Sequence, residues 1–301
     1  VDLSMQFDDN GFGVDLKDFR LNSFDPDFVL SSISFVAKQQ GDNLLVENLL
    51  LQTPKSSINA DAELHFAETP FYKIMLQSDS LSLNEISPFI NTDLPDLTPQ
   101  VNLDFILQND KTDLKAVVKT QSQQIDLTGK IASPFKNPKY DLKCGLENFN
   151  LANWIPENRF ANRISGEFKI DGTGTNPKTL SANVLAELSS PAVNSLVKEL
   201  ALNGHWENDS LKADLLLDGV AGALSADVEI NQVTQKPRYW ANLKTKNLNL
   251  FPVLNDSLYV SDLQIETTLS GAGFKYPNIN TELAVRILPS TFSGLQVDSL
   301  R

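Results

Sequence analysis

The sequence is poor in the residues from which catalytic and metal sites are most often built. It contains one cysteine, Cys144, and two histidines, His65 and His205, which lie far apart in the chain. A lone cysteine excludes a disulfide framework and a cysteine-type metal site. A zinc site or a catalytic triad needs histidines on converging supports. We therefore interpret both histidines as strand or turn residues, and we expect no metal and no cofactor.

Long apolar runs and an excess of basic charge are also missing. The longest apolar candidate, residues 29–37, is interrupted by serines and is shorter than the ~18 residues that span a bilayer. The chain has 38 acidic and 25 basic side chains and a net charge of −13. This balance opposes binding to nucleic acid and to anionic membrane, and it is typical of a soluble surface.

The two ends of the sequence predict that it is a fragment of a larger protein. It begins Val1-Asp2-Leu3 without a methionine, and it ends within an alternating run at Arg301. We therefore expect any signal peptide or membrane anchor to lie outside this segment.

Alternation of apolar and polar residues with a period of two dominates the sequence. Successive side chains of a strand point to opposite faces, so these runs predict strands with one dry and one wet face. The pattern favours an antiparallel sheet over a βαβ fold, whose strands would be apolar on both faces. The candidate residues of the dry face are Val101, Leu103, Phe105, Leu107, Leu114, Val118, Ile125, Leu127, Val184, Leu188, Leu211, Leu215, Leu217, Leu224, Val228 and Ile230.

Turn signals separate the runs and predict short hairpins, for example at residues 109–111 and 208–210. Helical spacing of apolar residues predicts a helix over 191–200. Short helices or turns are also expected over 28–37 and 84–90.

Internal repeats are the most informative feature of the chain. A Pro-x-Tyr unit occurs at residues 70–72, 138–140 and 237–239, and nine residues after each tyrosine comes an apolar-x-Leu unit. The tyrosines Tyr72, Tyr140 and Tyr239 are 68 and 99 residues apart, which is too irregular for a solenoid of fixed coils. We expect one continuous repeat-built segment over 1–301, with junctions near 70, 138 and 237 and these tyrosines as packing residues. A Gly-x-Gly unit at 172–174 recurs at 271–273, and we interpret both copies as turns.

These repeats resemble the AsmA-like superfamily and, within it, the TamB-type translocation-and-assembly proteins. The resemblance rests on residues 46–54 leading into 57–64, on the apolar-x-Leu units and on the Gly-x-Gly units followed by proline. It implies a long, U-shaped β-sheet with a hydrophobic groove (a "β-taco"). It also implies the periplasm of a Gram-negative envelope, phospholipid transport between the inner and outer membranes, and an outer-membrane β-barrel as a partner. The resemblance carries over no catalytic residues.

The residues themselves leave three hypotheses open. The dry face can pack on itself or on another sheet, or it can enclose lipid acyl chains. The favoured function is a non-enzymatic groove that holds or conducts phospholipid, and the alternative is a structural, protein-binding β-module that aids assembly of outer-membrane proteins. A polysaccharide-active enzyme would need a paired carboxylate on a groove floor, for which Asp8-Asp9 is one candidate.

Overall fold

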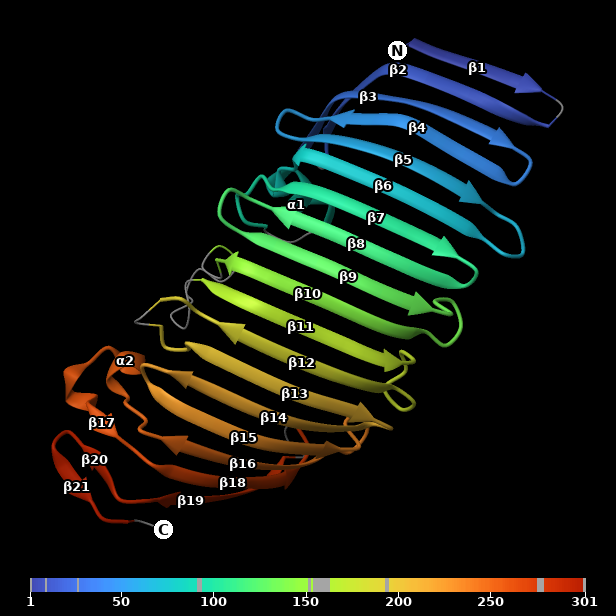
Figure 1. Ribbon diagram of the computed structural model, residues 1–301. Helices are drawn as coiled ribbons and strands as arrows, with labels where there is room; N and C mark the ends of the chain where they lie inside the picture. The colour runs from blue at the N-terminus through green and yellow to red at the C-terminus, as the bar shows by residue number, and fades with distance from the viewer. Residues whose placement is uncertain are drawn as a thin grey trace. The chain divides into compact units, whose positions relative to one another are not determined.

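The structure, a computed structural model, describes residues 2–8, 10–25, 27–90, 94–150, 153, 163–192, 195–274 and 279–299 (Figure 1). These residues form antiparallel strands with a few short helices, so the predicted fold class is confirmed. No helix among them is long and apolar enough to cross a membrane. The chain divides into two compact units, Val1–Lys136 with Leu142–Cys144 and Asn137–Asp141 with Gly145–Arg301.

The first unit is a meander in which each strand pairs antiparallel with the next along the chain (Figure 1). Its register shifts at bulges in β2–β3, β3–β4 and β4–β5, whereas β7–β8 and β8–β9 pair without a shift. The elements are β1 (Asp2–Asp8), β2 (Gly11–Phe24), β3 (Asp27–Gln40), β4 (Asn43–Gln52), β5 (Ser57–His65), β6 (Phe71–Ser80), α1 (Leu83–Ile90), β7 (Gln100–Gln108), β8 (Lys111–Lys119) and β9 (Gln124–Ala132).

The second unit is a similar meander with an added three-stranded sheet. Its pairs from β11 to β19 keep an unbroken register, and β17, β20 and β21 form the small sheet. The elements are β10 (Lys139–Phe149), which has residues in both units, β11 (Ile164–Thr173), β12 (Ser181–Ser189), β13 (Glu199–Glu207), β14 (Ser210–Gly219), β15 (Gly222–Asn231), β16 (Arg238–Lys246), α2 (Phe251–Leu254), the 3-10 helix η2 (Ser257–Tyr259), β17 (Ser261–Asp262), β18 (Ile265–Ala272), β19 (Asn280–Ile287), β20 (Ser290–Phe292) and β21 (Leu295–Val297).

The predicted hairpins form because their turn residues accept left-handed backbone. Asn109 and Asp110 have φ of 51° and 60°, and Asn208 and Asp209 have φ of 48° and 64°. Two successive residues at positive φ match the right-handed twist of the flanking strands, and asparagine and aspartate tolerate this conformation. Asp209 is buried, and it also accepts hydrogen bonds from the backbone N and the Oγ1 of Thr234, each at 3.0 Å.

Each Pro-x-Tyr unit stands at the start of a strand, namely β6, β10 and β16. The two Gly-x-Gly units are bonded to two of these starts. The backbone N of Gly174 donates to the Pro138 carbonyl at 2.8 Å, and that of Gly273 donates to the Pro237 carbonyl at 2.9 Å. Both glycines have positive φ, but the two residues before each of them are the last paired residues of β11 and β18. The Gly-x-Gly units are therefore strand ends in which only the second glycine leaves the ladder, and the prediction that they are turns is wrong for the rest of each unit.

Two of the three helix predictions are wrong. Residues 28–37 lie in β3, and the described part of 191–200 is a connection without helix that leads into β13. The amide of Ser190 donates to the Lys198 carbonyl and that of Lys198 to the Asp218 carbonyl, each at 2.7 Å. Bonds to neighbouring segments thus replace the local bonds of a helix. The third prediction, over 84–90, is confirmed by α1.

The helix α1 is fixed to the β4–β5 turn by one carboxylate. Glu85 accepts hydrogen bonds from the hydroxyls of Thr53 and Ser56, both at 2.5 Å, and from the Lys55 amide at 3.1 Å. At the other end of the helix, Phe89 packs edge-to-face on Phe28, with ring centroids 5.0 Å apart. These contacts hold the segment that follows the first apolar-x-Leu unit.

Candidate functional site

The candidate residues of the first unit lie on one face of its sheet. Directly paired residues in an antiparallel sheet share a face. Val101 pairs with Val118, which pairs with Ile125, and the next row contains Leu103 and Leu127. Phe105, Leu107 and Leu114 belong to the same face, which therefore contains all eight candidates of this unit.

The candidates of the second unit also share one face. Its register places side chains in rows that run across β12 to β16, from strand to strand. Leu188, Leu217 and Leu224 lie in one row, Leu215 in the next, Val184 and Val228 in a third, and Leu211 and Ile230 in a fourth. No acidic or basic residue occupies this face on these five strands. We call it the apolar face.

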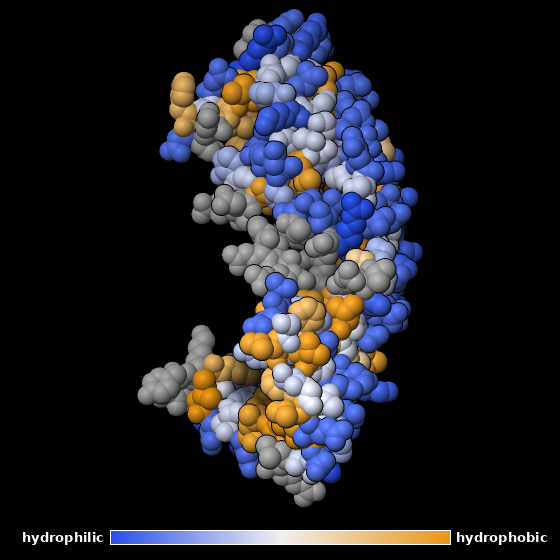
Figure 2. Space-filling view, turned by 90° about the vertical axis from the view of Figure 1, so that its left-hand side faces the viewer, coloured by the Kyte–Doolittle hydropathy of each residue, from blue (hydrophilic) through white to orange (hydrophobic). Residues whose placement is uncertain are grey.

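The apolar face has no second layer of protein over it among the described residues. Among the residues of the second unit that the structure describes, the buried aliphatic and aromatic side chains are all alanines: Ala182, Ala186, Ala226 and Ala241. The larger side chains between them, such as Leu215 and Val228, remain partly exposed. A packed core would bury such residues almost completely. Figure 2 shows hydrophobic residues gathered over the lower part of the view, where the second unit lies, beside a hydrophilic margin.

A row of small or β-branched residues crosses the apolar face, and we call this row the trough. The row made of Val184, Gly204, Ala213, Val228 and Ala241 runs from β12 to β16. Larger side chains flank it for most of its length. The flanking residues are Trp206, Leu211, Ile230 and Tyr239 on one side and Leu202, Leu215 and Leu243 on the other. The row runs perpendicular to the strands, so the trough extends across all five strands from β12 to β16.

The end of this trough widens into an apolar hollow of about 560 Å³. Its floor includes Val228, Ala241 and Leu269, and its wall includes Tyr239 and Phe274. The two rings stack with centroids 5.7 Å apart. The Tyr239 hydroxyl lies 2.5 Å from Thr281 Oγ1 on β19, so the ring is held by stacking on its face and by a polar contact of its hydroxyl across β18.

Gly271 makes this position of the tyrosine ring possible. It pairs with Tyr239, and a Cβ on Gly271 would lie 2.7 Å from the tyrosine oxygen and 2.4 Å from the Asn280 carbonyl oxygen. Tyr72 packs similarly on Phe66, with ring centroids 5.8 Å apart. Tyr72 and Tyr239 therefore have packing contacts.

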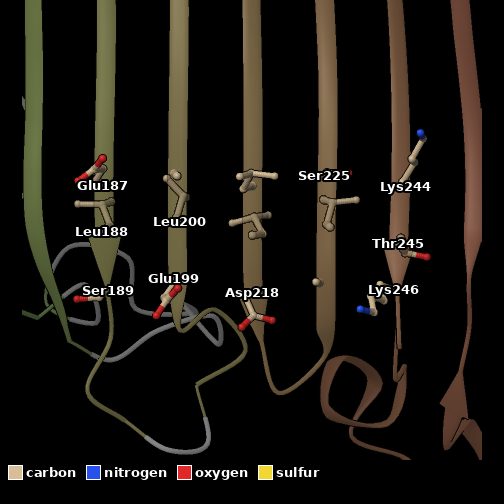
Figure 3. Close-up of a pocket in the computed structure, with 15 residues that line it drawn as sticks. Glu187, Leu188, Ser189, Glu199, Leu200, Asp218, Ser225, Lys244, Thr245 and Lys246 are labelled. Carbon is tan, nitrogen blue, oxygen red and sulfur yellow. The ribbon is translucent and has the colours of Figure 1, made fainter.

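A larger hollow of about 770 Å³ crosses β12 to β16 near one end of these strands (Figure 3). Its middle row belongs to the apolar face, and the rows on either side belong to the opposite face. Figure 3 shows Glu199 and Asp218 on neighbouring strands and Lys244 and Lys246 on β16. The lining is therefore mixed. It comprises Glu187, Leu188, Ser189, Glu199, Leu200, Ala201, Leu216, Leu217, Asp218, Ala223, Leu224, Ser225, Lys244, Thr245 and Lys246.

The opposite face is polar and carries cross-strand ion pairs. Lys212 Nζ lies 3.8 Å from Glu229 Oε1, and Arg286 Nη1 lies 3.6 Å from Glu266 Oε2. These pairs are exposed, so each contributes at most about 1 kcal/mol. Because the charged residues of these pairs lie on the opposite face, the second unit has one charged and one apolar face.

The histidines have structural environments. His65 Nδ1 lies 2.6 Å from Asn43 Oδ1, and His205 Nδ1 lies 2.7 Å from Asn183 Oδ1, in each case on an adjacent strand. Among the described residues, no group of three or more His, Cys, Asp or Glu side chains could hold a metal ion. Asp9, half of the carboxylate pair noted above, lies outside the described residues.

Burial raises the pKa of two groups on β10. The pKa of the Tyr140 phenol is raised first by desolvation and then by the charge of Asp171. The pKa of the Cys144 thiol is raised first by desolvation and then by the charge of Asp126. Both shifts favour the neutral side chain. Neither group is therefore an activated nucleophile.

The trough and the tyrosine wall are features that the sequence analysis missed. The signal for the trough was present, because Gly204, Ala213 and Ala241 sit at apolar positions of alternating runs. Only the strand register shows that these small residues stand side by side. No family model, curated protein or solved structure matches this chain.

Proposed function

We propose that this chain is a segment of a non-enzymatic protein that holds or conducts phospholipid acyl chains along the uncovered apolar face of its sheet. The observation that supports this most strongly is the near absence of buried large side chains on that face. An apolar face of this kind has to be covered by something in order to leave water, and the trough gives it a shape that suits an elongated apolar chain.

The energetics favour a lipid without a specific site. Transfer of an acyl chain from water to an apolar surface gains ~0.8 kcal/mol per CH₂, or roughly 12 kcal/mol for a fully buried 16-carbon tail. The half-buried leucines of the face would gain in the same way. No directional contact is needed, which suits a path along which lipids move.

The wider setting follows from the family resemblance. On this proposal the chain lies in the periplasm of a Gram-negative-type bacterium and bridges the inner and outer membranes. An outer-membrane β-barrel is the proposed protein partner. The repeats suit such a role because adding hairpins lengthens the face without changing its chemistry.

A matched pair of substitutions tests the proposal. Leu215→Asp places a charge on the apolar face, and Leu185→Asp places the same charge on the polar face, where Leu185 is already 43% exposed. We expect Leu215→Asp to lose co-purified phospholipid and at least about tenfold in affinity for a fluorescent fatty acid, because an ionised carboxylate is costly to bury. Leu185→Asp should retain both.

The result also separates the alternative function. If Leu215→Asp folds, as judged by circular dichroism, and binds the fatty acid as wild type does, the lipid proposal is wrong. Retention of a protein partner by that variant would then favour the protein-binding β-module.

A further inference from the structure

The second unit carries an apolar protrusion that the face described above does not explain. It spans residues 251–260, covering α2 and η2, and we call it the tip. Within ten residues its large apolar side chains Phe251, Val253, Leu254, Leu258, Tyr259 and Val260 are all exposed, with Leu258 67% exposed. A cluster of this density on a surface indicates a contact with another apolar body.

Many of the backbone amides of the tip are satisfied by bonds within the tip or to the residues that directly flank it. The amides of residues 253–255 donate to carbonyls three or four residues earlier, and Pro252 has no amide to satisfy. Asn249 Oδ1 accepts from the amides of Phe251 and Ser261, and Ser261 Oγ accepts from that of Leu250. A segment with its amides satisfied internally can enter the apolar edge of a bilayer without the several kcal/mol that each free amide would cost there.

The tip is braced from one side, so its shape does not depend on a partner. The amide of Ser293 donates to the Val260 carbonyl at 2.8 Å, and the Tyr259 and Phe292 rings lie 6.2 Å apart. The hairpin of β20 and β21 that supplies these contacts adds a further exposed leucine, Leu295.

The charged groups named at the tip and its base are few, and the acidic ones outnumber the basic one. The one ionisable group on the tip apart from the Tyr259 phenol is Asp256, whose carboxylate accepts the Leu258 amide as a helix cap. At the base, Lys246 lies on β16 just before the turn into α2 (Figure 3), and Asp262 accepts from Asn247 Nδ2. One lysine and two aspartates oppose an anionic surface, which would select a basic cluster, and they leave a zwitterionic headgroup, with its phosphate and amine, as the better match.

We propose that the tip docks the second unit on the surface of a zwitterionic phospholipid bilayer, with Phe251, Leu254 and Leu258 inserted among the lipids. Aromatic and aliphatic side chains on a short, amide-satisfied protrusion favour the interface of a bilayer. This docking does not require the apolar face to bind lipid, so the two proposals can fail separately. If both hold, the tip brings the 770 Å³ hollow, which Lys246 also lines, close to a source of lipid.

Vesicle flotation tests the docking. The purified chain is mixed with phosphatidylcholine vesicles, and the bound fraction is compared with that of the double variant Leu254→Asp/Leu258→Asp and of the control Leu185→Asp. We expect the tip variant to lose at least about tenfold in partitioning, because two leucines contribute more than 1.4 kcal/mol when they leave water. The control should float as wild type does, and added salt should change little.

Three results would overturn the docking. The tip variant could float like wild type, the control could lose as much as the tip variant, or flotation could require anionic lipid and disappear in salt. If the double variant fails to fold, Leu258→Trp replaces it, and the absence of a blue-shifted emission on adding vesicles would equally contradict the proposal. Leu215→Asp should still float, even where it no longer binds the fatty acid.

Discussion

The two units use the same alternating pattern but build different apolar surfaces. In the second unit, the row from Val184 to Ala241 consists of small or β-branched residues and forms a trough. In the first unit, the row across β5 to β9 has the bulky Ile74, Phe105 and Leu114 on three adjacent strands, between Ala62 and Gly129. A dry face is therefore set by alternation alone, whereas a hollow in that face is set by side-chain size within rows that cross the strands.

The unit that has the trough also has the more regular strand pairing. Bulges interrupt the register of β2 to β5, whereas β11 to β19 pair without a shift. Unbroken register keeps rows aligned over many strands, which a continuous trough requires. A bulge adds a residue to one strand and so offsets the rows on its two sides.

The largest effect is expected from closing the space under Tyr239. Gly271→Ala should lower the free energy of unfolding by ~1–3 kcal/mol, because the added methyl meets the tyrosine ring and a backbone carbonyl. The control in the first unit is Gly13→Ala, whose methyl would have no neighbour closer than 4.0 Å. Urea denaturation measures both, and equal losses would show that the tight packing is not specific to the tyrosine wall.

Filling the trough should affect ligand binding more than stability. Ala241→Phe places a ring on the floor of the 560 Å³ hollow, and we expect the affinity for a fluorescent fatty acid to fall about tenfold, the equivalent of ~1.4 kcal/mol. Ala284→Phe adds the same ring to the exposed polar face of β19. Titration of the fatty acid against both variants checks this, and an unchanged affinity for Ala241→Phe would place binding elsewhere.

Local features of the fold could be predicted because their causes are local. The Asn-Asp pair at 109–110 fixes a hairpin through its own backbone preference, and alternation around Leu215 fixes which side chains share a face. The helix prediction at 191–200 failed because this connection between β12 and β13 is held by hydrogen bonds to residues outside the segment, such as Asp218. Sequence spacing carries no information on such bonds.

The candidate site was predictable in its members but not in its shape. The eight candidates of each unit share one face of the sheet of that unit, because period-two alternation determines the face. Gly204 and Ala213 form part of the trough because they are paired with each other on adjacent strands. The tip was not anticipated either, because residues 251–260 show neither alternation nor a long helical period.

A smaller effect is expected from opening a hollow in the first unit. Phe105→Ala removes the largest side chain of the row across β5 to β9 and should raise fatty-acid binding to this unit a few-fold, since the ring no longer fills the face. Ile106→Ala removes a side chain from the opposite face and serves as the control. Both are measured in the Ala241→Phe background, so that binding to the second unit contributes little. A loss of binding on Phe105→Ala would show that the bulky row is itself the contact surface.

The smallest effect tests whether the fold keeps water from the Cys144 thiol on β10. Burial, and then the charge of Asp126, hold the thiol pKa above its ordinary value, so the folded chain favours the neutral thiol. The contribution of this pKa shift to the free energy of unfolding is fully present below the pKa of the unfolded thiol. It is lost as the pH rises through the pKa of the folded thiol. Thiolate absorbance should therefore appear at higher pH in the folded chain than in urea. Asp126→Asn should remove only the smaller part of this difference. If the folded and unfolded thiols titrate together, water reaches Cys144 as freely as it reaches the exposed Lys143 on the same strand, and the thiol is not buried.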